Sequence, residues 1–236
     1  VTVSLIPAVS AALTRQNTLQ ANRIISSSFR LIALFSLPAG VGLSVLAQPI
    51  LQLLYPAVPD TAAAAAYHLQ ILGAAAVFVC LMILTNAILQ ACGRVYVPIV
   101  TALIGGAVKI STTYTLCGNP VFGIKGAPIS TTACYAVIAV LNLCVLAAVL
   151  GKSRPRYLPL LCKPALAAAL MGGCAHFVFR FLHTAAGLSP QWAVLAAIVL
   201  AASFYAFLAL LLRMVTREDL ALIPKGEKIA KILHIR

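Results

Sequence analysis

One lysine, Lys109, lies inside an otherwise uncharged apolar run over residues 95–116. If that run crosses a membrane, an ammonium within it costs about 2.5–3.5 kcal/mol and is rarely left facing lipid. Lys109 therefore points to a cavity, a partner or an anionic substrate. The alternative is that its long side chain reaches the membrane interface, about two turns away along the helix.

Three uncharged amides, Asn86, Gln90 and Asn142, lie in other apolar runs. Buried amides need hydrogen-bond partners, so each is expected either to join neighbouring helices or to contact a substrate. His176, which follows a Gly-Gly pair and a cysteine, is predicted to pack between helices rather than to bind a ligand or relay protons.

Other kinds of chemistry have little support in the residues. The four acids, Asp60, Glu218, Asp219 and Glu227, lie outside the apolar runs, and none forms a recognisable motif with a histidine. The seven cysteines show no Cys-x-x-Cys pair and no metal-ligand spacing with the histidines, so they are interpreted as small apolar side chains. We therefore expect no enzymatic site, no cofactor and no metal.

The composition requires an apolar environment. Of the 236 residues, 62% are hydrophobic and only 9% are charged, and the mean hydropathy is +1.04. This is too little charge for a water-exposed surface, so lipid is the expected solvent. The net charge of +13 comes from short basic clusters between apolar runs, which does not fit a nucleic-acid-binding face.

Six apolar runs have the length that a membrane-spanning helix requires, about 20 residues. The predicted fold is therefore an all-α, polytopic transmembrane bundle. Residues 1–14 resemble the end of a further, truncated span, and the chain begins with Val1, so we expect a fragment of a longer protein. The predicted spans cover residues 31–54 with an interruption at Pro38, 67–91, 95–116, 126–150, 160–182 and 191–212.

Basic residues divide unevenly between the two sides of this bundle. The richer side is predicted to be cytoplasmic, because cytoplasmic loops retain Lys and Arg. Only Lys125 and Arg180 fall on the other side. Residues 216–236 are predicted to form a basic amphipathic helix on anionic lipids, or else a solvated tail. The cytoplasmic set is Arg15, Arg23, Arg30, Arg94, Lys152, Arg154, Arg156, Lys163, Arg213, Arg217, Lys225, Lys228, Lys231 and Arg236.

Helix-bending residues occur in two of the predicted spans. Pro38 and Pro49 remove backbone hydrogen bonds, and Gly40, Gly42 and the pair at 105–106 allow helices to approach closely. Bent helices suit a transporter, but they also suit any tightly packed bundle.

The order of several short motifs resembles the multidrug/oligosaccharidyl-lipid/polysaccharide exporter superfamily, and in particular the stage V sporulation protein B-like flippases of polysaccharide biosynthesis. The motifs are LIPAVS at 5–10, LPAGVGL at 37–43, LAQPI at 46–50, ILQACGR at 88–94, GGAVK at 105–109 and GIKGAPIST at 123–131.

The resemblance implies a two-lobe transporter of which this chain is the C-terminal half, with a missing N-terminal lobe as its partner. Residues 1–150 would form the partial C-terminal lobe, residues 151–215 two additional transmembrane helices, and residues 216–236 the cytoplasmic tail. It also implies a multi-pass protein of the bacterial cytoplasmic membrane with its C-terminus in the cytoplasm.

The implied activity is alternating access that carries a lipid-linked oligosaccharide or peptidoglycan precursor across the membrane, in wall, spore-cortex or polysaccharide synthesis. Such an anionic, amphipathic substrate needs a basic, wet cavity for its headgroup and an apolar cleft for its tail. The candidate substrate-binding residues are Lys109, Asn86 and Gln90 in the cavity, with Arg94, Arg23 and Arg30 at the cytoplasmic entrance.

Two other functions stay open. A cation-coupled multidrug antiporter of the same superfamily would require a buried carboxylate, which these spans lack. A non-transporting scaffold for wall-synthesis enzymes would require larger recognition segments than the short loops offer.

Overall fold

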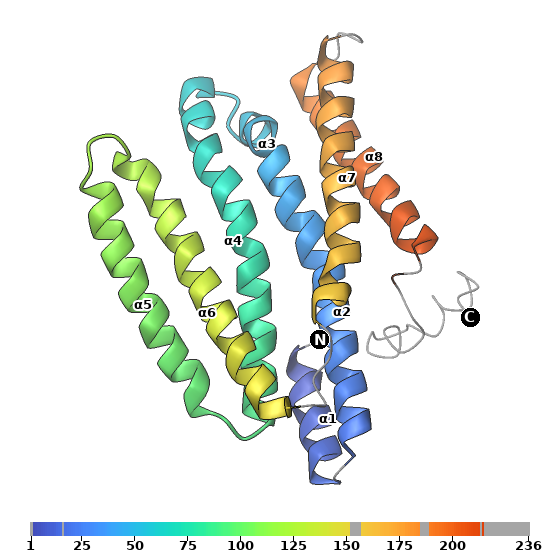
Figure 1. The fold of residues 1–236 in the computed structure, drawn as a ribbon. Helices are drawn as coiled ribbons and strands as arrows, with labels where there is room; N and C mark the ends of the chain where they lie inside the picture. The colour runs from blue at the N-terminus through green and yellow to red at the C-terminus, as the bar shows by residue number, and fades with distance from the viewer. Residues whose placement is uncertain (1, 16, 152–156, 185–188, 213, 215–236) are drawn as a thin grey trace.

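The computed structural model describes residues 2–15, 17–151, 157–184, 189–212 and 214, and these residues form an all-helical bundle (Figure 1). Six helices in this part of the chain are long and apolar enough to cross a membrane. This confirms the predicted all-α polytopic fold. The elements are α1 (Thr2–Thr14), α2 (Thr18–Val45), α3 (Ala47–Leu54), α4 (Pro59–Ala91), α5 (Tyr96–Cys117), the 3₁₀ turn η1 (Gly123–Lys125), α6 (Gly126–Leu150), α7 (Tyr157–Thr184) and α8 (Pro190–Leu211).

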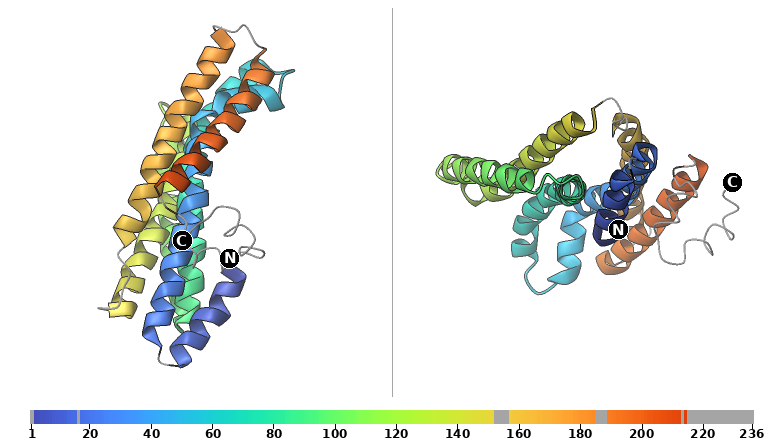
Figure 2. Two further views of the ribbon diagram at one scale, coloured as in Figure 1. Left: turned by 90° about the vertical axis from the view of Figure 1, so that its right-hand side faces the viewer. Right: turned by 90° about the horizontal axis from the view of Figure 1, so that it is seen from below.

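The long helices lie side by side in a row rather than around one centre. α5 packs mainly on α6, α6 on α4, α4 on α2, α2 on α7, and α7 on α8. Seen from below, α5 and α8 occupy opposite ends of this row, and α1 lies against α2 (Figure 2). α5 is therefore an edge helix, and only 11% of the residues in its membrane-spanning stretch are buried.

Two apolar clusters hold the row together. The first joins α1, α2, α4 and α6 through buried side chains such as Val9, Phe29, Ile88 and Leu146. The second joins α2, α3, α7 and α8 and is built largely from small residues. Along α8 the buried positions recur at every fourth residue, which places them on one face of the helix. That buried stripe consists of Ala193, Ala197, Ala201, Tyr205 and Ala209.

The first predicted span is wrong in its details. Residues 31–54 were expected to be interrupted at Pro38, but α2 continues through Pro38 and the helix breaks at Leu46 instead. The break precedes Pro49, which occupies the first turn of α3, where an N–H has no partner within the helix in any case. The start of α2 at Thr18 is fixed by Asn17, whose side chain accepts a 3.0 Å hydrogen bond from the Gln20 N–H.

Several helices extend beyond the apolar runs that predicted them. α4 begins at Pro59, eight residues before the predicted start at 67, and α7 covers 157–184 rather than 160–182. The added part of α4 consists of Pro59, Asp60, Thr61 and five alanines, and proline suits the first position of a helix, which explains the start at Pro59. α5, α6 and α8 agree with the predicted spans to within one residue at each end.

α2 and α4 cross at two glycines. A Cβ atom on Gly40 would lie 2.7 Å from the Gly73 carbonyl oxygen, and a Cβ on Gly73 would lie 2.7 Å from the Gly40 carbonyl oxygen. Beside this crossing, the Ser44 hydroxyl donates a 2.8 Å hydrogen bond to the Gln70 carbonyl. The predicted role of Gly40 in close helix approach is thereby explained, since only glycine lets these two backbones meet.

Candidate functional site

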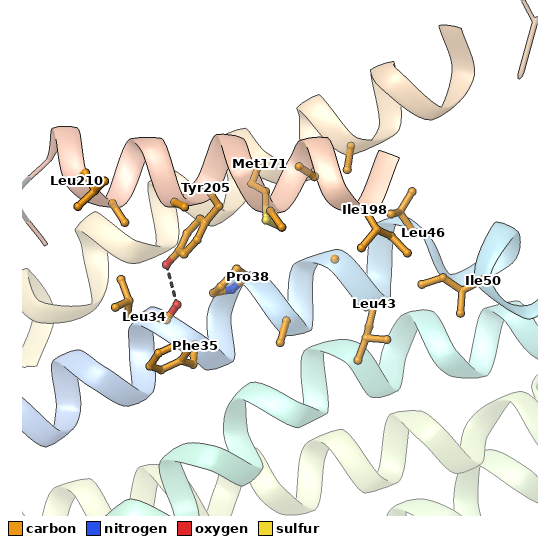
Figure 3. Close-up of a pocket in the computed structure, with 17 residues that line it drawn as sticks. Leu34, Phe35, Pro38, Leu43, Leu46, Ile50, Met171, Ile198, Tyr205 and Leu210 are labelled. Atoms are coloured by element: carbon orange, nitrogen blue, oxygen red, sulfur yellow. Dashed lines mark hydrogen bonds between the residues drawn. The ribbon is translucent and has the colours of Figure 1, made fainter. Parts of the chain in front are cut away.

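An apolar groove of about 700 Å³ lies between α2, α3, α7 and α8 (Figure 3). Among its 17 lining residues, Tyr205 alone carries a hydroxyl group. Phe35, Leu43 and Leu210 on its walls are 62%, 37% and 42% exposed, so the groove opens onto the outer surface of the bundle. α2 and α8, which form two of its walls, both have the length and hydropathy of membrane spans.

Small side chains create the space in this groove. α8 contributes Ala202 and Ala206, and α2 contributes Ala39 and Gly42. These positions leave room that leucine or phenylalanine would fill, while longer side chains such as Met171 form the floor and ends. The sequence analysis did not identify this groove. The alanine repeat along α8 is the sequence signal that could have indicated a close-packed face with space beside it.

The six predicted site residues lie on α2, α4, α5 and the turn between α4 and α5, not in the groove. Gln90 and Arg94 are exposed at the end of α4 and in the turn that follows. Arg23 is exposed and Arg30 half-buried on α2. Lys109 is exposed on α5, the edge helix.

Asn86 belongs to a buried polar network that joins α4, α5 and α6. The Asn142 amide donates to the Asn86 Oδ1 at 2.7 Å and to the Thr85 Oγ1 at 3.2 Å, and the Thr101 hydroxyl donates to the Asn142 Oδ1 at 2.8 Å. Asn142 and Thr85 are fully buried. Both amide hydrogens of Asn142 and its oxygen are therefore engaged, as expected for helix-to-helix contact.

Lys109 does not join this network. It lies eight residues beyond Thr101 along α5, which is about 12 Å along the helix axis. Close to the level of Lys109, the C-terminal half of α5 carries a run of hydroxyl side chains at 111–113 and 115, and the Thr113 hydroxyl donates to the Ser130 hydroxyl of α6 at 2.7 Å. The polar part of α5 thus combines one ammonium with several hydroxyl groups.

A second set of polar contacts, which the sequence analysis missed, lies where α4 meets η1. The Nε2 atom of His68 is 3.3 Å from the Ile124 carbonyl, and the Lys125 ammonium lies 5.7 Å from the centre of the Tyr67 ring. These contacts hold the turn between α5 and α6 against α4. Within the described residues, no three His, Cys, Asp or Glu side chains gather as possible metal ligands.

Cys92 follows α4 directly, and burial raises the pKa of its thiol. A raised pKa keeps the thiol protonated at neutral pH, and the protonated form is a poor nucleophile. This is consistent with its interpretation as a small apolar residue.

The fold and the groove together define a polytopic, all-helical membrane protein with an apolar groove on its outer surface. A family model described as lipid II flippase MurJ matches residues 1–200. The chain belongs to the lipid II flippase MurJ family.

One curated relative of the chain is a considerably longer protein. The chain is 27% identical over 239 residues to the uncharacterized membrane protein YabM of Bacillus subtilis (strain 168). The alignment covers 100% of this chain and 43% of the relative, so the chain spans less than half of that protein's length. No solved structure matches the chain.

Proposed function

We propose that the protein containing this chain is a flippase that moves a lipid-linked oligosaccharide or peptidoglycan precursor across the cytoplasmic membrane by alternating access. Membership of the lipid II flippase MurJ family supports this class of activity. The single observation that carries the proposal is the apolar groove, which can accept a long hydrocarbon tail.

The groove has the chemistry of a tail-binding site. Its lining offers one hydroxyl and otherwise aliphatic or aromatic surface, so a polyprenyl-type chain would enter it without desolvating polar groups. Each CH₂ group transferred from water into such a site contributes about 0.8 kcal/mol, but a tail that arrives from lipid gains much less. The groove therefore guides the tail, and the headgroup supplies specificity.

The headgroup is proposed to bind residues on the other side of α2. Lys109, with the hydroxyl groups of outer α5, would bind an anionic pyrophosphate or sugar, and Asn86 and Gln90 would extend that surface. Arg94, Arg23 and Arg30 would draw the headgroup from the cytoplasm. Arg94 lies in the turn between α4 and α5 at the lower end of the helices in Figure 1, and α2 begins at that same lower end, which supports a shared entrance.

The proposal also includes the division of the chain into lobes and its orientation in the membrane. Residues 1–150 would be part of a C-terminal lobe that works against a missing N-terminal lobe, and residues 151–215 two helices added to it. The motif order supports the stage V sporulation protein B-like branch, and with it a role in spore-cortex or wall synthesis. The basic residues Arg15, Arg23 and Arg94 support a cytoplasmic lower end in Figure 1, with the C-terminus on that side; the tail at 216–236 lies outside the described residues.

The proposal is tested by filling the groove in the full-length protein. Ala202→Phe and Ala206→Phe place rings in the groove, and we expect each to reduce the flipping of a labelled lipid-linked precursor in reconstituted vesicles. Ala169→Phe on α7 is the matched control, because Ala169 is exposed and does not line the groove. Unchanged flipping in both groove variants would refute the tail site, and drug-driven proton flux without flipping would indicate the antiporter instead.

A further inference from the structure

Pro38 leaves one carbonyl of α2 without its helical partner. Proline has no N–H, so the Leu34 carbonyl, four residues earlier, receives no hydrogen bond from position 38. Within a membrane no water can replace that bond, and an unpaired carbonyl there is costly. α2 nevertheless remains helical from Thr18 to Val45, and a donor from a neighbouring helix is one way to satisfy the freed carbonyl.

The missing donor comes from α8. The Tyr205 hydroxyl donates a 2.8 Å hydrogen bond to the Leu34 carbonyl oxygen, across 171 residues of sequence. Both residues are 9% exposed, so the bond is largely buried. Figure 3 shows the tyrosine pointing from α8 towards α2, directly beside Pro38.

This hydrogen bond lies at one end of the groove. Leu34, Phe35 and Leu210 surround it, whereas Leu46, Ile50 and Ile198 lie at the opposite end (Figure 3). α8 is packed mainly against α7 and α3 and touches α2 much less. The Tyr205 bond is therefore the polar tie between the α2 wall and the α8 wall of the groove.

We propose that Tyr205 and the proline-freed carbonyl of Leu34 form a latch that closes this end of the groove. Tyr205 is a positioning residue: it holds α8 against the proline position of α2, and separation of the two helices leaves the carbonyl unpaired. Pro38 makes this carbonyl the one in its turn of α2 that receives no N–H from position i+4, so the Tyr205 hydroxyl replaces a missing bond instead of adding a second one. The latch itself is a statement about the geometry of the groove. Any effect that it has on tail binding or transport rests on the proposed function.

The test is a double-mutant cycle in the full-length protein, with Tyr205→Phe, Pro38→Ala and the two combined. Alanine at 38 restores the N–H that pairs with Leu34, so the hydroxyl becomes dispensable. Nitroxide labels on Ser203 of α8 and Ile83 of α4, attached through encoded keto side chains, report the distance between the helices. Both labelled positions are exposed and outside the groove. Tyr135→Phe, on α6, is the control.

We expect Tyr205→Phe to broaden and lengthen the label distance and to lower the Tm by about 2 °C or more. In the Pro38→Ala background the same substitution should change neither. Equal effects in both backgrounds, or none in the Pro38 background, would overturn the latch. If Pro38→Ala does not fold, Pro38→Ser supplies the same N–H. These readouts need no substrate, so the latch can hold even if the flippase activity is disproved.

Discussion

Replacing Asn142 by leucine tests the buried network that joins α4, α5 and α6. The substitution keeps a similar side-chain volume and removes three hydrogen bonds, to Thr85, Asn86 and Thr101. Of the two threonines, Thr101 loses its acceptor but lies 3.2 Å from another, the Pro98 carbonyl, and Thr85 keeps the 2.8 Å bond that its hydroxyl donates to the Leu81 carbonyl. The Asn86 oxygen and the Thr85 hydroxyl oxygen each lose the donor that Asn142 supplied.

The expected loss follows from these bonds. Hydrogen bonds between membrane helices contribute about 0.6 kcal/mol on average, so three contribute roughly 2 kcal/mol. Because two threonines keep an acceptor, we expect Asn142→Leu to lower the free energy of unfolding by about 1–2 kcal/mol. The assay is SDS unfolding of the full-length protein in mixed micelles, followed by circular dichroism.

A matched control and a cycle make the result decisive. Gln70→Leu, an amide exposed on α4, should leave stability unchanged. Asn142→Leu combined with Thr101→Val should be less destabilising than the sum of the single variants, because both remove the same 2.8 Å bond. Strict additivity, or an Asn142→Leu protein as stable as the unmodified one, would refute the reasoning.

Three further predictions concern other parts of the chain. Gly73→Ala forces a Cβ atom to within 2.7 Å of the Gly40 carbonyl, so we expect a loss of about 1–3 kcal/mol and a lower Tm; Gly106→Ala, with no atom within 4 Å, is the control, and equal Tm values would contradict the close crossing. Lys109→Ala and Arg94→Ala should each reduce precursor flipping without changing the Tm, and the headgroup site should be abandoned if flipping persists. Burial raises the pKa of the Cys92 thiol, so less thiolate is present at pH 7. Its labelling by a maleimide should therefore be slower than that of a fully exposed cysteine thiol and should become faster as the pH rises. Labelling at the rate of an exposed thiol would contradict this prediction.

The sequence alone determined the class of fold and the place of most helices. A span of about 20 apolar residues reports the thickness of the membrane directly, which is why α5, α6 and α8 were predicted to within one residue. The distribution of charge also selected Lys109 as a candidate residue, because a single lysine is conspicuous in an otherwise uncharged apolar run. The start of α4 at Pro59 was missed, because an apolar run shows that a span exists but does not mark the residue at which its helix begins.

Only the tertiary structure decided what the polar residues inside the spans do. From the sequence, contact between helices was the favoured role for Asn86 and Asn142 and substrate contact the alternative, and the structure pairs the two across 56 residues. Pro38 was expected to interrupt its helix, yet α2 continues, and Tyr205 of α8 donates to the carbonyl that the proline leaves free. The groove arises in the same way, from small residues on helices far apart in sequence. Which side chains meet across helices depends on how the helices pack, and neither hydropathy nor spacing along one helix contains that information.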